Sequence, residues 1–384
     1  MIKLRRPQKL YWRPAEIPLG AMLVLAAAAL AALIVVETFT HEHSSDYYSQ
    51  MLSASRHVQQ SIESLRPIRG RIEPIDPEVD PLRSGLIGLP TSSITSNSGS
   101  LDAKQATINP NWAAVVIRLL AEADVKPGDQ VAVAVSGSFP ALNLAVYTAL
   151  EAMDITPLII VSGSGSQWGA NVPGFAWLDI AGQLRETGLI KTREIAATLG
   201  GIEDRGIGMD ERGLEIIRQA ARKADVELFE PDNYEAAVVE RIQRYTDAAG
   251  GRPIAAFINV GGGTATTGPS GTSHYFGSGL LHSAPSGAFK VPSVMGHYLR
   301  EGVPVINFSG LRNLTTQFDM PYPPVQAVSV GSGGAYRAES YRRWLAGSMI
   351  LALLGLTALI MRSANIALAA GSGRKGRDTL RPRV

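Results

Sequence analysis

Twenty consecutive uncharged residues near the start of the chain set the strongest limit on its fold. The run from Ile17 to Val36 reads IPLGAMLVLAAAALAALIVV. As a helix rising ~1.5 Å per residue, it covers the ~30 Å hydrocarbon core of a bilayer, so it predicts a membrane span. A cleaved signal peptide is the alternative, but its apolar part usually has only about 7 to 15 residues, and no clear A-x-A site closes this run.

A second uncharged run lies near the other end of the chain. Leu345 to Met361 reads LAGSMILALLGLTALIM, with Trp344 before it and Arg362 after it. An aromatic residue and a long basic side chain commonly sit at the two interfaces of a bilayer, so this run predicts a second span. The alternative for either run is a helix buried in the core of a soluble domain.

The charges beside the first span predict the orientation of the chain. Five basic residues precede it and acidic residues follow it, which the positive-inside rule assigns to a cytoplasmic N-terminus. Two spans then make residues 1–16 and 362–384 basic cytoplasmic tails and leave the main domain outside the cytoplasm. The basic residues before the span are Lys3, Arg5, Arg6, Lys9 and Arg13, and the acidic ones after it are Glu37, Glu42 and Asp46.

The charge of the part between the tails argues against nucleic acid as a partner. The chain has 36 basic and 34 acidic residues, of which eleven basic and two acidic ones lie in the tails. The remaining 25 basic and 32 acidic residues give residues 17–361 a formal charge of about −7, which repels anionic polymers on average. The chain has no cysteine, which excludes disulfides, thiol nucleophiles and Cys-ligated zinc.

Residues 37–100 have the pattern of a tether between the first span and the domain. From His41 to about Leu65, apolar residues recur every three or four positions, which predicts a stalk helix. Residues 66–100 hold five prolines and a Ser-rich stretch, which predicts an extended connector. The recurring residues are Tyr47, Met51, Ala54, Val58, Ile62 and Leu65.

Regular alternation of strand and helix patterns marks residues 101–336 as one α/β domain. Each buried-strand pattern is followed by a helix pattern, which predicts a mostly parallel, doubly wound, Rossmann-like sheet. The Gly-, Ser- and Pro-rich region 268–295 predicts a loop that covers the sheet edge or contacts a partner. We expect strands at 130–135, 157–161, 254–260 and 303–308, and helices at 112–123, 140–153, 175–187, 213–224 and 234–248.

Small polar residues follow three of the expected strands. In a parallel sheet, ligands bind beyond the carboxyl ends of the strands, where glycine lets backbone amides approach an anion. These segments therefore predict a site for a carboxylate or phosphate group, although tight turns also need small residues. No G-x-x-x-x-G-K-[ST] motif is present, so we expect no nucleotide cofactor. The predicted ligand-binding residues are Ser136, Gly137, Ser138, Ser162, Gly163, Ser164, Asn259, Gly261, Gly262, Gly263 and Thr264.

A serine-dependent hydrolase or transferase is the catalytic alternative. Ser136 or Ser164 would be the nucleophile, and His274, His282 or His297 would be the base. No G-x-S-x-G elbow supports this arrangement. The histidine spacings of eight and fifteen match no local metal motif, so we expect no metal site.

Several short motifs together resemble the poly-gamma-glutamate system protein family. They are Tyr11-Trp12-Arg13-Pro14, SGSFPALN at 136–143, QWGAN at 167–171 and GGGTA at 261–265, between two terminal spans. The resemblance implies a bacterial inner-membrane protein that works beside the ligase and the small integral membrane protein that make and export poly-γ-glutamate. It implies an accessory role, with ATP-dependent ligation in another subunit, and no catalytic residues are carried over.

Three functions remain open from the sequence. The first is a non-catalytic assembly or export component that contacts a glutamate-containing ligand and the partner subunits, with the basic tail from Arg362 touching anionic lipid headgroups or a cytoplasmic subunit. The second is the exported serine hydrolase or transferase acting on a γ-linked glutamate polymer. The third is a membrane-tethered module that binds a small ligand.

Overall fold

The computed structural model describes residues 19–261, 263–324 and 326–375, and it divides into two units. One unit comes from the two ends of the chain, Met1–His43 and Ala338–Val384, and the other is Ser44–Arg337. The predicted tail 1–16 lies outside the described residues, as does the end of the tail predicted at 362–384.

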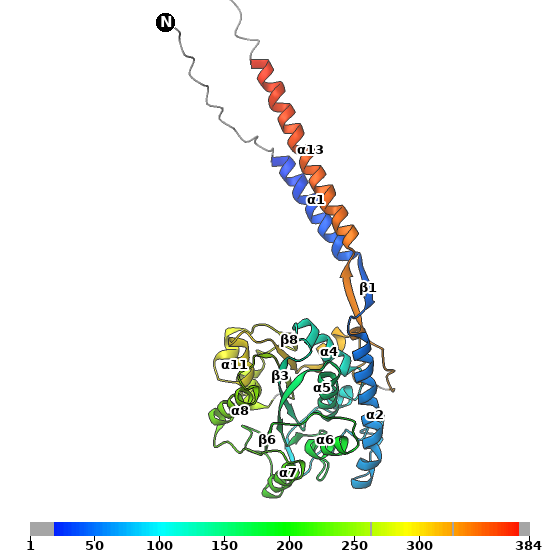
Figure 1. The fold of residues 1–384 in the computed structure, drawn as a ribbon, viewed down its shortest axis with the longest axis vertical. Coiled ribbons are helices and arrows are strands. Elements are labelled where there is room, and N and C mark those ends of the chain that lie inside the picture. Colours follow the sequence, from blue (N-terminus) through cyan, green and yellow to red (C-terminus); the bar gives the residue numbers. More distant parts are fainter. Residues whose placement is uncertain (1–18, 262, 325, 376–384) are drawn as a thin grey trace, which may run out of the picture. The chain divides into compact units, whose positions relative to one another are not determined.

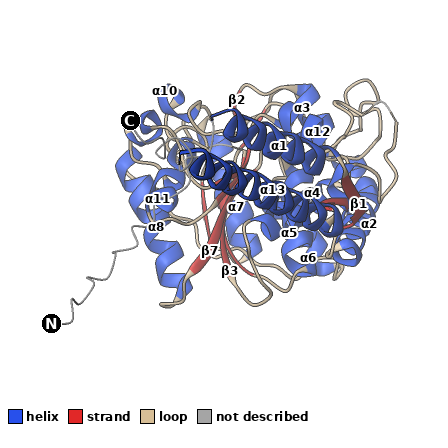
Figure 2. Cartoon of the chain, turned by 90° about the horizontal axis from the view of Figure 1, so that it is seen from above, coloured by secondary structure: helices blue, strands red, loops and turns tan. Residues whose placement is uncertain are grey.

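The terminal unit contains the two apolar helices. α1 (Leu19–Thr38) lies beside α13 (Arg343–Lys375), and β1 (Thr40–Ser44) pairs with β10 (Arg337–Tyr341) (Figures 1 and 2). Leu19–Thr38 and Arg343–Ser363 are long and apolar enough to cross a membrane, and neither stretch has a buried residue. Neither helix is therefore a core helix of the domain.

The unit Ser44–Arg337 is built on a mostly parallel six-stranded sheet, as the sequence predicted. Five strands run parallel, and β8 at the edge runs antiparallel to β9. The chain goes outward from β3 to β4 and β6 and then returns to β7 on the other side of β3. The strands, in spatial order, are β6 (Ala196–Thr198), β4 (Thr156–Ser162), β3 (Gln130–Ser136), β7 (Ile254–Val260), β9 (Val305–Phe308) and β8 (Gly279–Leu281).

Helices cover both faces of this sheet. Successive side chains of a strand point to opposite faces, so Val131, Val133 and Val135 pack in one core and Ala132 and Ala134 in another. The valine side carries α2 (Tyr48–Ile72), α4 (Trp112–Glu122), α5 (Pro140–Ala152) and α6 (Trp177–Glu186), and the alanine side carries α8 (Tyr234–Ala249) and α11 (Val294–Arg300) (Figure 1).

Shorter elements complete the unit. The two-residue strand β5 (Gly165–Ser166) pairs in parallel with β2 (Thr95–Asn97) in a separate small sheet. The remaining helices are α3 (Leu101–Thr107), α7 (Glu211–Ala224), α9 (Thr264–Thr267), α10 (Ser270–Ser273) and α12 (Leu311–Gln317), with 3-10 turns η1 (Ser286–Phe289) and η2 (Gly334–Tyr336).

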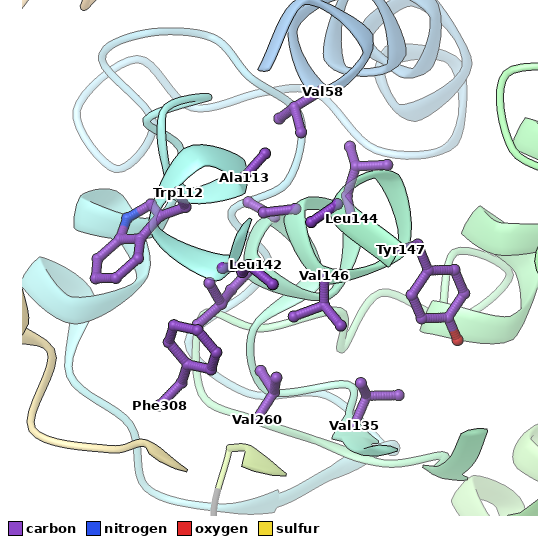
Figure 3. Packing of buried hydrophobic residues seen from close by; sticks show 14 of the residues in the cluster. Val58, Trp112, Ala113, Val135, Leu142, Leu144, Val146, Tyr147, Val260 and Phe308 are labelled. Atoms are coloured by element: carbon purple, nitrogen blue, oxygen red, sulfur yellow. The ribbon is translucent and has the colours of Figure 1, made fainter. Parts of the chain in front are cut away.

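The larger core joins the sheet to α4 and α5. Phe308 of β9 lies next to Leu142 of α5, and Val135 of β3 lies below Val146 of the same helix (Figure 3). The Trp112 ring meets the Phe308 ring edge-on at 6.1 Å between centroids, and its indole N–H donates to the carbonyl of Ala106 at 2.8 Å. Close packing of these side chains holds the ends of the central strands in place.

The helix that was expected to be a stalk instead packs in this core. This corrects the prediction that residues 37–100 form a tether between the first span and the domain. The periodicity predicted the helix α2 itself, but Met51, Ala54, Val58 and Leu65 are buried in the same cluster as α5. An apolar stripe of this length needs cover, and the domain provides it. The expected connector is also folded onto the domain, since Ile94 is fully buried beside β2.

The region 268–295 contains more regular structure than expected. It holds α10, β8, η1 and the first residues of α11. β8 supplies the edge strand of the sheet by pairing with β9. A three-residue strand is too short to leave an alternating pattern, so the sequence did not predict it.

Candidate ligand-binding site

A cavity lies at the carboxyl ends of β3, β4 and β7, where the sequence predicted a site. Its volume is about 60 Å³. Segments after four parallel strands reach it, and residues of β2 close one side. We call it the strand-end cavity; it is lined by Ser96, Asn97, Ser136, Ser138, Ser162, Ser164, Gly201, Ile202, Gly261, Gly263 and Thr264.

Seven of the predicted ligand-binding residues line this cavity. They come together because parallel strands end at one edge of the sheet, and because the chain reverses its direction of winding between β3 and β7. The seven are Ser136, Ser138, Ser162, Ser164, Gly261, Gly263 and Thr264. Gly262 lies outside the described residues.

Three other predicted ligand-binding residues do not line the cavity and instead pack against the protein around it. A Cβ on Gly137 would come within 2.8 Å of the Ser164 carbonyl oxygen, and one on Gly163 would clash with Ile217. Asn259 is buried in the sheet and donates from Nδ2 to Oδ1 of Asn307 at 2.8 Å. These residues permit close packing behind the cavity wall.

Two hydroxyl groups of the wall keep a proton to donate. Ser136 Oγ accepts a long bond from the Ser138 backbone N–H (3.3 Å), and Ser138 Oγ accepts one from the Ser166 backbone N–H (3.1 Å). Neither hydroxyl proton has an acceptor among the described residues, whereas Ser164 Oγ donates to Ser96 Oγ at 3.0 Å. A serine hydroxyl both donates and accepts, so Ser136 and Ser138 can donate to an anionic ligand.

A buried ion pair supports the floor of the cavity. Asp204 and Arg241 are 2.5 Å apart, and both are almost fully buried. Burial alone would lower the pKa of Arg241, but the charge of Asp204 and its hydrogen bond raise it above its ordinary value. Ser162 Oγ donates to Asp204 at 3.1 Å and accepts from Arg241 Nη2 at 2.8 Å, so the pair fixes this hydroxyl.

The loop that carries Asp204 is held in an unusual conformation. Glu203 and Asp204 have φ values of 59° and 61°, in the left-handed region that L-residues rarely adopt. Each such residue costs on the order of 1 kcal/mol or more. The Glu203 backbone N–H donates to Thr264 Oγ1 at 2.6 Å, and the ion pair with Arg241 holds Asp204 in place. These contacts keep the strained backbone next to the cavity.

Lys104 lies behind the wall of the cavity, on α3. Its Nζ donates to the Ser138 carbonyl at 2.6 Å and to Ser166 Oγ at 2.7 Å, and it lies 3.6 Å from the centroid of the Phe139 ring. The residue is only 2% exposed. Burial lowers the pKa of Lys104 to about 7. The sequence did not predict a role for Lys104, Asp204 or Arg241, because each is a single charged residue without a motif around it.

The predicted histidines do not reach the strand-end cavity. His274 and His282 are exposed, and the His274 ring lies against Tyr275. His297 is on α11, with its ring beside Tyr298. None of them is bonded to Ser136 or Ser164 in the part of the chain that the structure describes, so no serine–histidine pair is formed there. Within the same residues, no three His, Asp or Glu side chains gather as metal ligands.

Comparison with known proteins gives no relative for this chain. No family model matches it, and neither a curated protein nor a solved structure does. What the cavity binds must therefore follow from the groups that line it.

Proposed function

We propose that this chain is a membrane-anchored accessory protein of poly-γ-glutamate biosynthesis or export. In this proposal, its α/β domain binds a carboxylate group of a glutamate-containing ligand in the strand-end cavity. The resemblance of the segments 136–143, 167–171 and 261–265 to the poly-gamma-glutamate system family supports the pathway. Two of these segments supply residues of the cavity wall, which ties the resemblance to the site.

The observation that carries the ligand assignment is the pair of free hydroxyl donors at the strand ends. Ser136 and Ser138 can donate two hydrogen bonds into a cavity of about 60 Å³. This volume suits a group of a few atoms, such as a carboxylate, and is too small for a nucleotide. A doubly wound, Rossmann-like strand order is part of the proposal, because such sheets bind ligands where the winding reverses.

The proposed location is the bacterial inner membrane. α1 and the apolar part of α13 would span it, with both termini in the cytoplasm and the domain outside. Their length and apolar composition support the spans, and the five basic residues before residue 17 support the orientation. The ligase and the small integral membrane protein of the pathway would be the partners.

The role that we propose is non-catalytic. A serine nucleophile needs a base within hydrogen-bond reach, and His274, His282 and His297 are not among the residues that line the cavity. Lys104 is bonded to Ser166, which is not a cavity residue, and the close approach of the Gly99 backbone covers that hydroxyl. We therefore do not propose the hydrolase.

Equilibrium dialysis of the full chain in mild detergent against labelled γ-glutamyl-glutamate tests the proposal. We expect saturable binding, and we expect Ser136→Ala to weaken it about tenfold or more, because a hydrogen bond to a charged group is lost. Ser283→Ala, at an exposed serine outside the cavity, is the matched control and should bind like the wild type. Absence of binding, or equal loss in both variants, would contradict the assignment.

A further inference from the structure

A separate cavity lies beside α2, on the helix that the sequence predicted as a stalk. Its volume is about 150 Å³. Four segments that are far apart in the sequence line it: α2, the residues before β2, the turn between α3 and α4, and residues 327–328. We call it the α2 cavity; its apolar wall consists of Ile62, Leu82, Ile108, Pro110, Ala327 and Val328.

Hydrogen bonds hold two of these segments in place. Ser84, in the segment before β2, donates from Oγ to Asp80 Oδ2 at 2.9 Å. Asn111, directly before α4, donates from Nδ2 to the Ser329 carbonyl at 2.9 Å and accepts from the Gly331 backbone N–H at 3.0 Å. The walls of the α2 cavity are therefore formed before any ligand binds, which is typical of small-molecule sites.

Asn109 contributes an unused hydrogen-bond donor to this wall. It lines the α2 cavity and is only 2% exposed. Its Oδ1 accepts from the Asn111 backbone N–H at 3.0 Å, whereas its Nδ2 has no acceptor among the residues that the structure describes. Buried amide N–H groups almost always have a partner, because an unpaired one is unfavourable. A ligand oxygen in the α2 cavity would supply the missing acceptor.

Side chains of both charges lie at the mouth of the α2 cavity. Glu63 and Arg66 line it, are exposed, and lie about one turn apart on the same face of α2. Arg66 Nε donates to the Arg83 carbonyl at 2.6 Å, and Glu63 Oε1 accepts from Gln59 Nε2 at 3.0 Å. Neither charge has an ion-pair partner in the described part of the chain. The Nη groups of Arg66 and Oε2 of Glu63 are therefore available to a ligand.

We propose that the α2 cavity binds a free α-amino acid with an aliphatic side chain. Arg66 and Asn109 donate to the carboxylate of the amino acid, and Glu63 accepts from its ammonium. The two charged groups of an amino acid are attached to one carbon atom, which matches two opposite charges one helical turn apart. The apolar wall covers the aliphatic side chain.

The size of the α2 cavity fits this class of ligand. A cavity of about 150 Å³ holds about six non-hydrogen atoms, which is enough for the side chain of valine or leucine with the charged groups at the mouth. The α2 cavity and the strand-end cavity share no lining residue. The inference therefore goes beyond the proposed function and does not depend on it.

Calorimetric titration of the full chain in mild detergent with L-valine and three truncated probes tests the site. Glycine lacks the isopropyl group, 3-methylbutanoate lacks the ammonium, and 2-methylpropylamine lacks the carboxylate. We expect saturable binding of valine. Glycine should bind about fiftyfold more weakly, because three carbon atoms are no longer buried. Each of the other two probes should bind about tenfold or more weakly, because hydrogen bonds to a charged group are lost.

Two substitutions assign the charged groups of the ligand to their partners. Asn109→Asp keeps the acceptor for the Asn111 N–H and replaces the Nδ2 donor with an oxygen. It should weaken valine and 3-methylbutanoate about tenfold or more, but it should not weaken 2-methylpropylamine, which has no carboxylate. Glu63→Gln should weaken valine and 2-methylpropylamine and leave 3-methylbutanoate unchanged. A general loss of structure would instead weaken all the probes together.

A bulky residue at the mouth tests the location of the site. Ala327 is exposed, so Ala327→Trp should fold normally, cover the α2 cavity and abolish the binding of valine. Gln326→Trp is the matched control, because Gln326 is the exposed neighbour and does not line the cavity. This control should bind valine like the wild type.

The inference is overturned if valine does not bind saturably, or if glycine binds as tightly as valine. It is also overturned if Ala327→Trp and Gln326→Trp bind valine equally well. Ser136→Ala, in the strand-end cavity, should leave the affinity for valine unchanged. A failure of γ-glutamyl-glutamate to bind would contradict the proposed function alone, and a failure of valine to bind would contradict this inference alone.

Discussion

At the scale of single residues, the buried ammonium of Lys104 has a cost that depends on pH. Burial lowers its pKa from 10.5 to about 7, so between these values the unfolded chain binds a proton that the folded chain has released. The free energy of unfolding therefore rises with pH over this range, by at most about 1.4 kcal/mol per pH unit. The cost is fully present below pH 7 and disappears towards pH 10.5.

Replacement of Lys104 by methionine should stabilise the folded protein at neutral pH. We expect a gain of about 2 kcal/mol or more at pH 7, which shrinks as the pH rises towards 10, because the lysine of the unfolded chain then also begins to lose its proton. Denaturant unfolding of the full chain in detergent, followed by tryptophan fluorescence at both pH values, measures the gain. Lys290→Met is the control. A gain of equal size at both pH values would show that the charge of Lys104 carries no such cost.

The sequence predicted the residues of the site unevenly. Ser136, Ser138 and Gly261 were found because small residues after buried strands leave a pattern that can be read. Lys104 and Asp204 were not, because a lone charged residue looks like a solvated one until the fold shows it to be buried. The tertiary arrangement alone brings them beside the cavity.

At the scale of elements, long patterns were predicted well and short ones were not. The strands β3, β4 and β7 and the helices α4, α5 and α8 lie close to their expected ranges, since each has a buried run or a clear period. β6 and β8 have three residues each, which is too few for a period. The helix α2 was predicted, but its place was not, because periodicity shows an apolar face without showing what covers it.

Truncation of a buried side chain on α2 tests its place in the domain. Leu65 is fully buried and Ile72, on the same helix, is 42% exposed. We expect Leu65→Ala to lower the free energy of unfolding of the domain by about 2 to 5 kcal/mol and Ile72→Ala by about 1 kcal/mol or less. Chemical denaturation of the full chain measures both. Small, equal effects would indicate a helix that does not pack on the sheet.

At the scale of the whole molecule, the distribution of charge and of apolar helices predicts how the chain lies in a membrane. The natural chain has no cysteine, so a single introduced cysteine reports one position. In intact cells, a membrane-impermeant maleimide should label Ser283→Cys in the domain. It should label Thr379→Cys in the tail only after the cells are opened. The reverse pattern would show that the domain faces the cytoplasm.

The central claim is that this chain works as an accessory protein of poly-γ-glutamate synthesis or export. The most direct measurement is affinity purification of the tagged full chain from its own membrane in mild detergent, with mass spectrometry of the proteins that accompany it. We predict recovery of a ligase that has a phosphate-binding loop together with a small integral membrane protein. Recovery of the chain without either of them, from cells that are making the polymer, would contradict the account.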